Sequence, residues 1–308
     1  MDPTLAACFQ ANAMVASRAE LYALGISRQS IDRATAKGQV IRVGRSALVE
    51  AHTWTNAQPS ERHALRARAA MRVLRGRPLA LSHHSALSVM GLPVYGVDDK
   101  VHLAHTHAGS HHRSGAWVRH PAVPGDWIIW RDQMPIVRAS LASLQVADAF
   151  GVEAGLVSAD AAMAAGSSAV DFQQALSVGR FGRGVTSART VAAFADPRME
   201  SPGESRARWL MRVCGLPACE PQAWIRGPGG FAARVDFLFA DHRTIVEFDG
   251  MLKYRSPDAL RAEKIREDRL RKLGYEVVRL TWADLADPAR VKRLILDAFG
   301  RAARSRAS

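Results

Sequence analysis

The sequence predicts a multi-domain α/β chain of the α+β kind, and three observations lead to this fold class. The chain has 308 residues, enough for two or three domains with separate hydrophobic cores. Near its beginning, helix caps and a short turn have helix-turn-helix spacing. Toward its end, helical and strand patterns follow in the order αβββαβα. The expected domains are a winged helix-turn-helix (1–50), a central α+β domain (51–196), an αβββαβα domain (201–300) and a basic tail (301–308).

The charge balance indicates a polyanionic partner. The formal net charge is +13 and the pI is about 10.6, so nucleic acid is the first partner to expect. A membrane is not expected, because no apolar run approaches about 18 residues and no basic amphipathic anchor is present. The start, MDPTLAACFQ, lacks the pattern of a secretory signal. The three cysteines form no CxxC pair, which favours a cytoplasmic location.

The first domain is expected to contain two short helices and a two-stranded wing. Ser17 and Glu20 have the spacing of a capping box for the first helix. Ser27 caps the second helix, RQSIDRATAK, after a very short turn. The stretch QVIRVGRSALVE then predicts two strands about Gly44 and Arg45.

The second helix of this domain would place its N-terminal half in a DNA major groove. Ile31 and Ala34 are expected to face the domain core. The outward-facing side chains of the helix and the arginines of the wing are the candidate DNA contacts: Arg28, Gln29, Asp32, Arg33, Arg42 and Arg45. The alternative is a helical packing module whose basic face is solvated.

The central domain is expected to contain helices and a small sheet. A basic helix begins at Ser60, and Ser82 caps the short helix HHSALSVMG. The runs KVHLAHTH, AWVRHPAV and WIIWRDQ predict strands. Alanine-rich apolar spacing then predicts helices over Ser140–Phe150, Val157–Gly166, Val170–Val178 and Ser187–Phe194.

Histidines are concentrated in this central domain. Seven of the eleven histidines form two patches, at His83, His84, His102, His105, His107, His111 and His112. Histidine-rich tracts can bind zinc, but these lack a firm ligand spacing with cysteine or acidic partners. We therefore expect solvated strand ends, or neutral histidines beside DNA phosphates, in place of a dedicated metal site.

The last domain begins at Ser201 with a capped helix. Ser201 is the N-cap, Pro202 the first helical position and Glu204 the third, so Glu204 can complete a capping box. A strand, a glycine-rich turn and a hairpin follow. Ser256 and Pro257 open a long helix, and YEVVRLTWADL and DPARVKRLILDAFG add a strand and a closing helix.

The hairpin AARVDFLFADHRTIVEFDG carries three acids in an apolar context. Its apolar runs, Val235–Phe239 and Thr244–Phe248, predict buried strands around the polar turn between them. In this register Asp236 lies opposite Glu247, and Asp249 shares their face because side chains alternate along a strand.

Like charges held this close repel one another unless a cation lies between them. A hard divalent ion such as Mg²⁺ prefers oxygen ligands, so Asp236, Glu247 and Asp249 form a candidate metal site. The alternative is that one acid ends a strand and another forms an ion pair with an arginine.

The long helix has arginines within its apolar stripe. At about 100° per residue, five apolar residues share one side: Ala259, Ala262, Ile265, Leu270 and Leu273. Arg266 and Arg269 fall in the same stripe, where a charge is costly unless it is paired. Such an arginine can meet a hairpin acid or a bound phosphate, or it can snorkel outward with its stem buried. Lys264 is expected to point toward solvent.

Residues 201–299 resemble a family grouped with very-short-patch-repair endonucleases in the PD-(D/E)XK nuclease superfamily, through SPGES, RVDFLF, VEFDGMLKY, AEKIREDRLRKLG and VVRLTW. Residues 6–50 are similar to the N-terminal winged helix of AbiEi-type antitoxins. The central LSHHSALSVMGLP resembles a segment that often follows that winged helix.

The nuclease resemblance implies a restriction-endonuclease-like fold and a catalytic set. Glu204, Asp236 and Glu247 match the three acids of the superfamily. Asp249 stands where the superfamily has lysine, so the basic group would come from Lys253, Arg266 or Lys264. The implied activity is hydrolysis of DNA phosphodiesters with Mg²⁺ or Mn²⁺.

The antitoxin resemblance implies a different function. In this alternative the protein is a non-catalytic transcriptional regulator or antitoxin of a toxin-antitoxin or phage-defence system, with a cognate toxin as partner and the nuclease fold as a binding module. An RNA substrate is less favoured, because no aromatic-rich RNA-reading motif is present.

Overall fold

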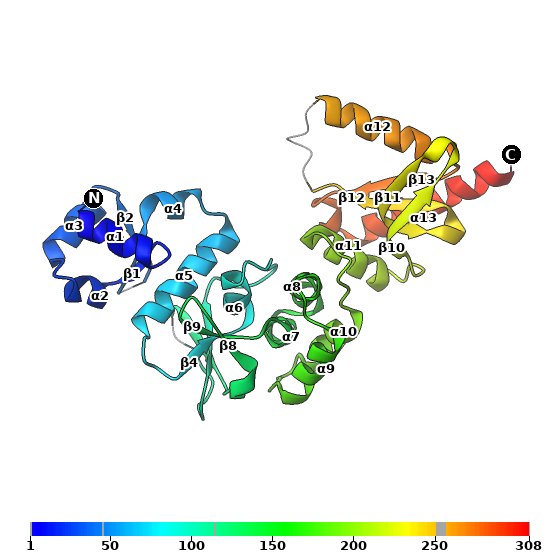
Figure 1. Cartoon of the computed structure of the whole chain (residues 1–308). Helices are drawn as coiled ribbons and strands as arrows, with labels where there is room; N and C mark the ends of the chain where they lie inside the picture. The colour runs from blue at the N-terminus through cyan, green and yellow to red at the C-terminus, as the bar shows by residue number, and fades with distance from the viewer. Residues whose placement is uncertain (1, 45, 114, 251–256, 308) are drawn as a thin grey trace. The chain divides into compact units, whose positions relative to one another are not determined.

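A computed structural model describes residues 2–44, 46–113, 115–250 and 257–307. Helices and strands are mixed along the chain (Figure 1), in agreement with the predicted α+β class. The chain divides into two compact units, Met1–Ala195 and Asp196–Ser308. Within the described ranges, no helix is long and apolar enough to cross a membrane.

The first unit begins with three helices and a three-stranded antiparallel sheet of order β1-β3-β2. The predicted capping box is present, since Glu20 N–H donates to Ser17 Oγ and Ser17 N–H donates to the Glu20 carboxylate. Ile31 and Ala34 are buried, as predicted. The elements are α1 (Pro3–Ala11), β1 (Val15–Ser17), α2 (Arg18–Ala23), α3 (Arg28–Ala36), β2 (Val40–Arg42) and β3 (Ala47–Glu50).

A six-stranded sheet of order β6-β7-β5-β4-β9-β8 follows. The three strands expected from sequence are present as β5, β7 and β8, whereas β4, β6 and β9 were not predicted. The elements are α4 (Ala51–Asn56), α5 (Pro59–Val73), β4 (Leu79–Leu81), α6 (His83–Val89), β5 (Val101–His105), β6 (His112–Arg113), β7 (Trp117–His120), β8 (Ile128–Arg131) and β9 (Met134–Val137).

Four helices complete the first unit. A Cβ at Gly155 would collide with Ala147, so this glycine permits α7 and α8 to pack closely. The helix predicted from Val157 begins earlier in the structure. The four helices are α7 (Ala139–Phe150), α8 (Val152–Ala164), α9 (Ala169–Val178) and α10 (Val185–Phe194).

The second unit has the predicted element order αβββαβα. Its sheet has the order β10-β11-β12-β13, with antiparallel pairs except for the parallel pair β12 and β13. Helix α13 continues through residues 301–307, which were predicted as a tail. The elements are α11 (Pro202–Val213), β10 (Glu220–Arg226), β11 (Ala232–Phe239), β12 (Thr244–Phe248), α12 (Pro257–Lys272), β13 (Glu276–Leu280) and α13 (Pro288–Ala307).

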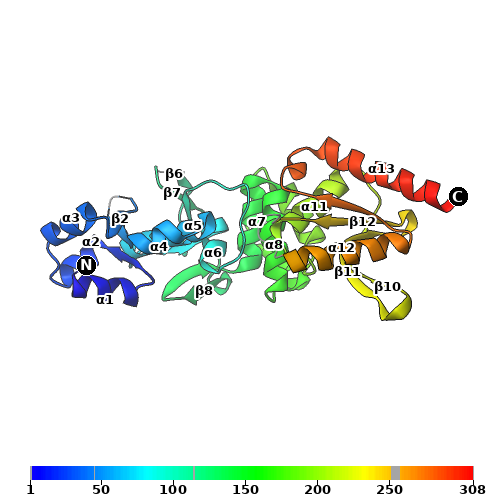
Figure 2. The same ribbon diagram turned by 90° about the horizontal axis from the view of Figure 1, so that it is seen from above.

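Apolar clusters cover both faces of this sheet, with α12 and α13 on opposite faces (Figure 2). One cluster joins Phe237 and Val246 to residues of α11 and α13. The other joins Leu238, Ile245 and Leu270. Each fully buried side chain of this size stabilises the fold by about 1.5–3 kcal/mol. The hairpin is therefore fixed from both sides.

The predicted apolar stripe of α12 is wrong at Ala262 and Ile265, and the side chain of Ala259 lies outside the described residues. Ile265 is 55% exposed, whereas Leu270 is fully buried. The middle of the helix meets the sheet through charged groups, because Arg266 contacts Glu247 and Glu263 contacts Arg279. Lys264 is exposed, as predicted.

Candidate active site

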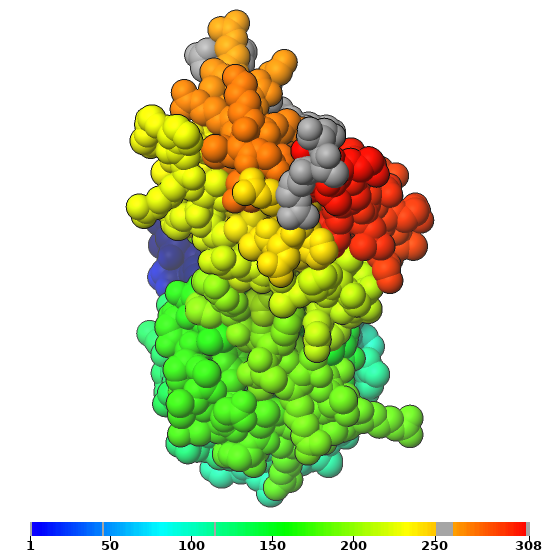
Figure 3. All heavy atoms as spheres, turned by 90° about the vertical axis from the view of Figure 1, so that its right-hand side faces the viewer, coloured from blue at the N-terminus to red at the C-terminus, as the bar shows by residue number. Residues whose placement is uncertain are grey.

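The register of the acidic hairpin is the one predicted. Phe237 pairs with Val246 and Phe239 pairs with Thr244 in the antiparallel ladder of β11 and β12. The ladder ends at Phe237, and the next residue, Asp236, accepts the Phe248 N–H through its side chain. Glu247 lies on the face of the sheet that α12 covers, because it contacts Arg266, and Asp236 lies near the same arginine. The surface of α12 (orange) adjoins that of the hairpin (yellow) in Figure 3.

Asp236 is an acid held in an unfavourable place for a negative charge. Its Oδ2 accepts a 2.8 Å hydrogen bond from the Phe248 N–H. The pKa of Asp236 is raised to about 6, chiefly by burial and also by the negative charges of Glu204 and Glu200, whereas the Phe248 N–H and Arg266 lower it. A divalent cation would stabilise the negative charge of a desolvated carboxylate of this kind.

Glu247 is buried and is bonded to arginine. Its Oε1 accepts a 2.6 Å hydrogen bond from Arg266, and its Oε2 lies 3.5 Å from an Arg279 nitrogen. Burial raises the pKa of Glu247 even though both arginines lower it. Desolvation therefore outweighs the ion pairs, as is common for buried charges.

Arg279 is a site residue that the sequence analysis missed. The parallel register of β12 and β13 places it opposite Glu247. Its guanidinium also lies 3.8 Å from an Asp249 oxygen, 3.0 Å from Glu267, and beside Glu263. The available signal was an arginine inside the apolar run VVRLTW, where a charge needs partners.

Glu204 serves both the helix cap and the acid cluster. Its N–H donates to Ser201 Oγ, and its carboxylate accepts hydrogen bonds from Ser201 Oγ (2.7 Å) and Gln222 Nε2 (2.9 Å). A Cβ at Gly203 would collide with the Phe248 ring, so glycine lets the start of α11 approach the end of β12. This approach brings the charge of Glu204 near Asp236.

The other predicted catalytic residues differ in what the structure shows. Asp249 has an 8% exposed side chain beside Arg279. Arg266 contacts Glu247, as the stripe analysis allowed. Lys253 lies outside the described residues. The basic groups seen at the acids are therefore arginines from α12 and β13.

The fit to a metal rests on the donor set. Asp236, Glu247 and Asp249 offer carboxylate oxygens, the ligands that Mg²⁺ and Mn²⁺ prefer. Among the described residues, the groups of three ligand atoms within 4.8 Å of one another contain none of these acids; both are histidine-rich and lie in the first unit. Arginine nitrogens, which compete with a cation, are already in contact with Glu247 and Asp249.

The predicted DNA-binding residues lie on α3 and β2 of the first unit. Three of them, Arg28, Gln29 and Arg33, are exposed on α3. Arg42 is also exposed but forms a 2.8 Å ion pair with Asp32. Arg45 lies outside the described residues.

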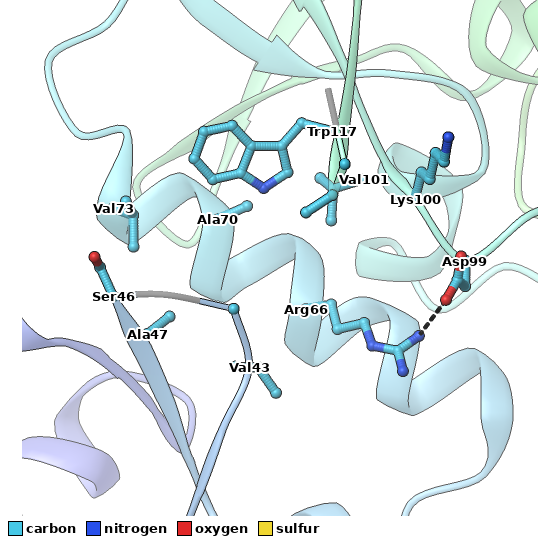
Figure 4. Close-up of a pocket in the computed structure, with 13 residues that line it drawn as sticks. Val43, Ser46, Ala47, Arg66, Ala70, Val73, Asp99, Lys100, Val101 and Trp117 are labelled. Atoms are coloured by element: carbon cyan, nitrogen blue, oxygen red, sulfur yellow. Dashed lines mark ion pairs between the residues drawn. The ribbon is translucent and has the colours of Figure 1, made fainter. Parts of the chain in front are cut away.

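A cavity of about 640 Å³ lies in the first unit (Figure 4). Its lining is mainly apolar, with Val43, Ala70 and Trp117 among the contributors, and the 4.0 Å ion pair between Arg66 and Asp99 lies at its side. It contains none of the predicted catalytic acids, so it does not extend the acid site.

No family model matches the chain. Uncharacterized proteins from two strains of Mycobacterium tuberculosis, CDC 1551 / Oshkosh and H37Rv, are 35% identical to it over 133 residues. The match covers 43% of this chain and 49% of each relative, so the chain spans about half the length of the curated relatives it matches.

Proposed function

We propose that the protein binds DNA and that its second unit is a Mg²⁺-dependent endonuclease that hydrolyses DNA phosphodiesters. The observation that carries this proposal is that two desolvated acids, Asp236 and Glu247, lie close enough at the end of the β11 and β12 ladder for the charge of Asp236 to raise the pKa of Glu247. Glu204 on α11 and Asp249 at the end of β12 add two more acids. A sheet that needed only stability would gain more from apolar residues at these positions.

The residues would divide the work as follows. Asp236, Glu247 and Asp249 would hold Mg²⁺ or Mn²⁺, with Glu204 beside them. The bound ion would polarise a phosphate and favour hydroxide formation from water. Arg266 would stabilise negative charge on the phosphoryl oxygens, the role that lysine fills elsewhere in the superfamily that the sequence resembles.

Arg279 would position the acids. It lies opposite Glu247 and contacts carboxylates from β12 and α12 at the same time. An arginine fork that binds several carboxylates orients them better than a point charge does. Its contribution to the reaction would thus be indirect.

DNA would be bound by the exposed basic face of α3. The side chains suited to contacts with phosphates and base edges are exposed on this helix: Arg28, Gln29 and Arg33. The net charge of +13 supplies the sequence-independent attraction.

One observation favours a second function, a non-catalytic regulator or antitoxin. Arg266 and Arg279 already compensate Glu247, so this acid is neutralised without a metal. In this case the winged helix would bind a promoter, and the second unit would bind a partner such as a cognate toxin.

Cleavage of plasmid and linear DNA with Mg²⁺ or Mn²⁺ separates the two functions. Asp236→Asn and Glu247→Gln should each reduce the wild-type rate by about 100-fold or more, because metal assistance contributes several kcal/mol to such reactions. Asp241→Asn is the matched control, since Asp241 is an exposed acid in the turn of the same hairpin. Absence of wild-type cleavage with either metal, together with retained DNA binding, would exclude the enzyme and support the regulator.

A further inference from the structure

Five histidines of the first unit lie together in what we call the histidine cluster: His63, His83, His84, His102 and His120. The expectation of solvated histidines is wrong for His83, His84 and His102, which are at most 5% exposed, and His63 is also buried. His120 is partly buried. The ring centroids of His83 and His120 are only 3.9 Å apart, and the rings are stacked.

Three members of the cluster come from three elements that are distant in sequence. His83 begins α6, His102 lies in β5, and His120 ends β7. Strands β5 and β7 are parallel neighbours in which His102 pairs with Val118 and Ala104 pairs with His120. His102 and His120 are therefore diagonal neighbours on one face of the sheet.

Three of these rings have the geometry of a ligand set. One ring nitrogen from each of His83, His102 and His120 lies within 4.8 Å of the others. The His120 Nε2 to His102 Nδ1 distance is 3.0 Å. Two nitrogens bound to one tetrahedral Zn²⁺ at about 2.05 Å would be roughly 3.3 Å apart, so a small movement admits the ion.

The remaining nitrogens of two of these rings are held by neighbours. His102 Nε2 lies 3.2 Å from Asp98 Oδ1, and His83 Nδ1 lies 3.0 Å from Ser82 Oγ. A carboxylate bonded to the outer nitrogen fixes the tautomer and orients the ring, as it does for metal-bound histidines. This arrangement leaves His102 Nδ1, which lies 3.0 Å from His120 Nε2, available to a shared ligand.

Backbone and side-chain strain also converge on the cluster. His83 has a φ of 51°, a left-handed conformation that is costly for a residue with a Cβ. His84 is fully buried, and its Nδ1 has no hydrogen-bond partner among the described residues. Costs of this kind are characteristic of functional sites.

A cavity of about 40 Å³ borders His83 and His120 and gives room for a water as a fourth ligand.

We propose that His83, His102 and His120 bind one divalent transition-metal ion, with Zn²⁺ as the best fit and Asp98 as the residue that positions His102. Nitrogen ligands favour Zn²⁺ over Mg²⁺, which distinguishes this site from the carboxylate site of the second unit. The proposal does not depend on nuclease activity.

The test uses the full chain, freed of metal by chelator and titrated with ZnCl₂ or CoCl₂. We expect one equivalent of Zn²⁺ to bind and to raise the unfolding temperature, and Co²⁺ to give the visible absorption of a four-coordinate nitrogen site. His102→Ala and His120→Ala should abolish both effects. The matched control is the double variant His107→Ala/His112→Ala, which removes two exposed histidines of the same domain and should bind metal like the wild type.

Asp98→Asn keeps the test decisive if the histidine variants do not fold. It leaves all three ligands in place and should weaken Zn²⁺ binding by about 10–100-fold. The proposal is overturned if the wild type binds no Zn²⁺ or Co²⁺. It is equally overturned if loss of His107 and His112 removes the binding, or if folded His102→Ala and Asp98→Asn bind as the wild type does.

Discussion

The acid site of the second unit and the histidine cluster of the first unit bury polar groups by opposite means. The acid site keeps its charges and surrounds them with cations, since Arg279 alone contacts carboxylates of Glu247, Asp249, Glu263 and Glu267. The histidine cluster holds its rings neutral, because burial lowers their pKa values. One site balances charge and the other avoids it.

The two solutions respond differently to the loss of one member. Removing a cation from the acid site strands a buried negative charge, which is costly. Removing one neutral imidazole costs packing and hydrogen bonds but leaves no net charge behind. The comparison therefore predicts that the stability of the second unit is sensitive to single arginines.

Arg279→Met should show this difference with the largest effect on stability. It removes one of the two described arginines from Glu247 and a cation beside Asp249, so we expect the free energy of unfolding of the second unit in urea to fall by about 3 kcal/mol. Arg271→Met is the control, because Arg271 pairs with Glu267 at the surface and should cost less than about 1 kcal/mol. Adding Glu247→Gln to Arg279→Met should recover part of the loss. Equal effects of the two arginine variants would show that charge compensation does not stabilise this site.

Asp236→Asn tests the opposite effect on stability in the same site, because removal of this acid should stabilise the fold. The pKa of Asp236 is raised to about 6 in the folded chain, from an ordinary value of 3.8. Below pH 4 the carboxyl is protonated in both states and imposes no penalty. Between pH 4 and pH 6 the unfolded chain loses its proton first, so stability falls as pH rises and stays lower above pH 6.

In buffer with chelator, Asp236→Asn should therefore match the wild type at pH 4 and exceed it by about 2 kcal/mol at pH 7.5. The amide oxygen can still accept the Phe248 N–H bond, so packing is retained. Urea unfolding at several pH values measures the difference. A variant less stable than the wild type at pH 7.5 would mean that Asp236 is compensated in the folded protein.

Local sequence patterns were sufficient to predict the strands and the register of the acidic hairpin. Strand alternation and the position of one turn determine its register, so the pairing of Phe237 with Val246, next to the two acids, could be predicted from sequence. Arg279 could not be placed in the same way, because it reaches Glu247 through parallel pairing across the whole of α12. Strands such as β1, β4 and β6 have only two or three residues, too few for a periodic pattern.

The histidine cluster could not be predicted from sequence patterns, for a related reason. His83, His102 and His120 come from elements that meet only when the six-stranded sheet forms. Two members, His63 and His120, fall outside the histidine-rich tracts altogether. Metal-ligand spacing rules describe ligands on one loop or helix, and this cluster has none of that kind.

Ile265→Ala is the smallest test and concerns how α12 is held over the acid site. If charged contacts such as Arg266 with Glu247 hold the middle of the helix on the sheet, the 55% exposed Ile265 contributes little to packing. Its replacement should then change the free energy of unfolding by less than about 0.5 kcal/mol. Leu270→Ala, in the buried half, should cost about 2–5 kcal/mol because it opens a cavity. Both values come from the same urea unfolding measurement. A cost above 2 kcal/mol for Ile265→Ala would contradict this view. It would mean that hydrophobic contacts hold α12 along its length, as the apolar stripe predicted.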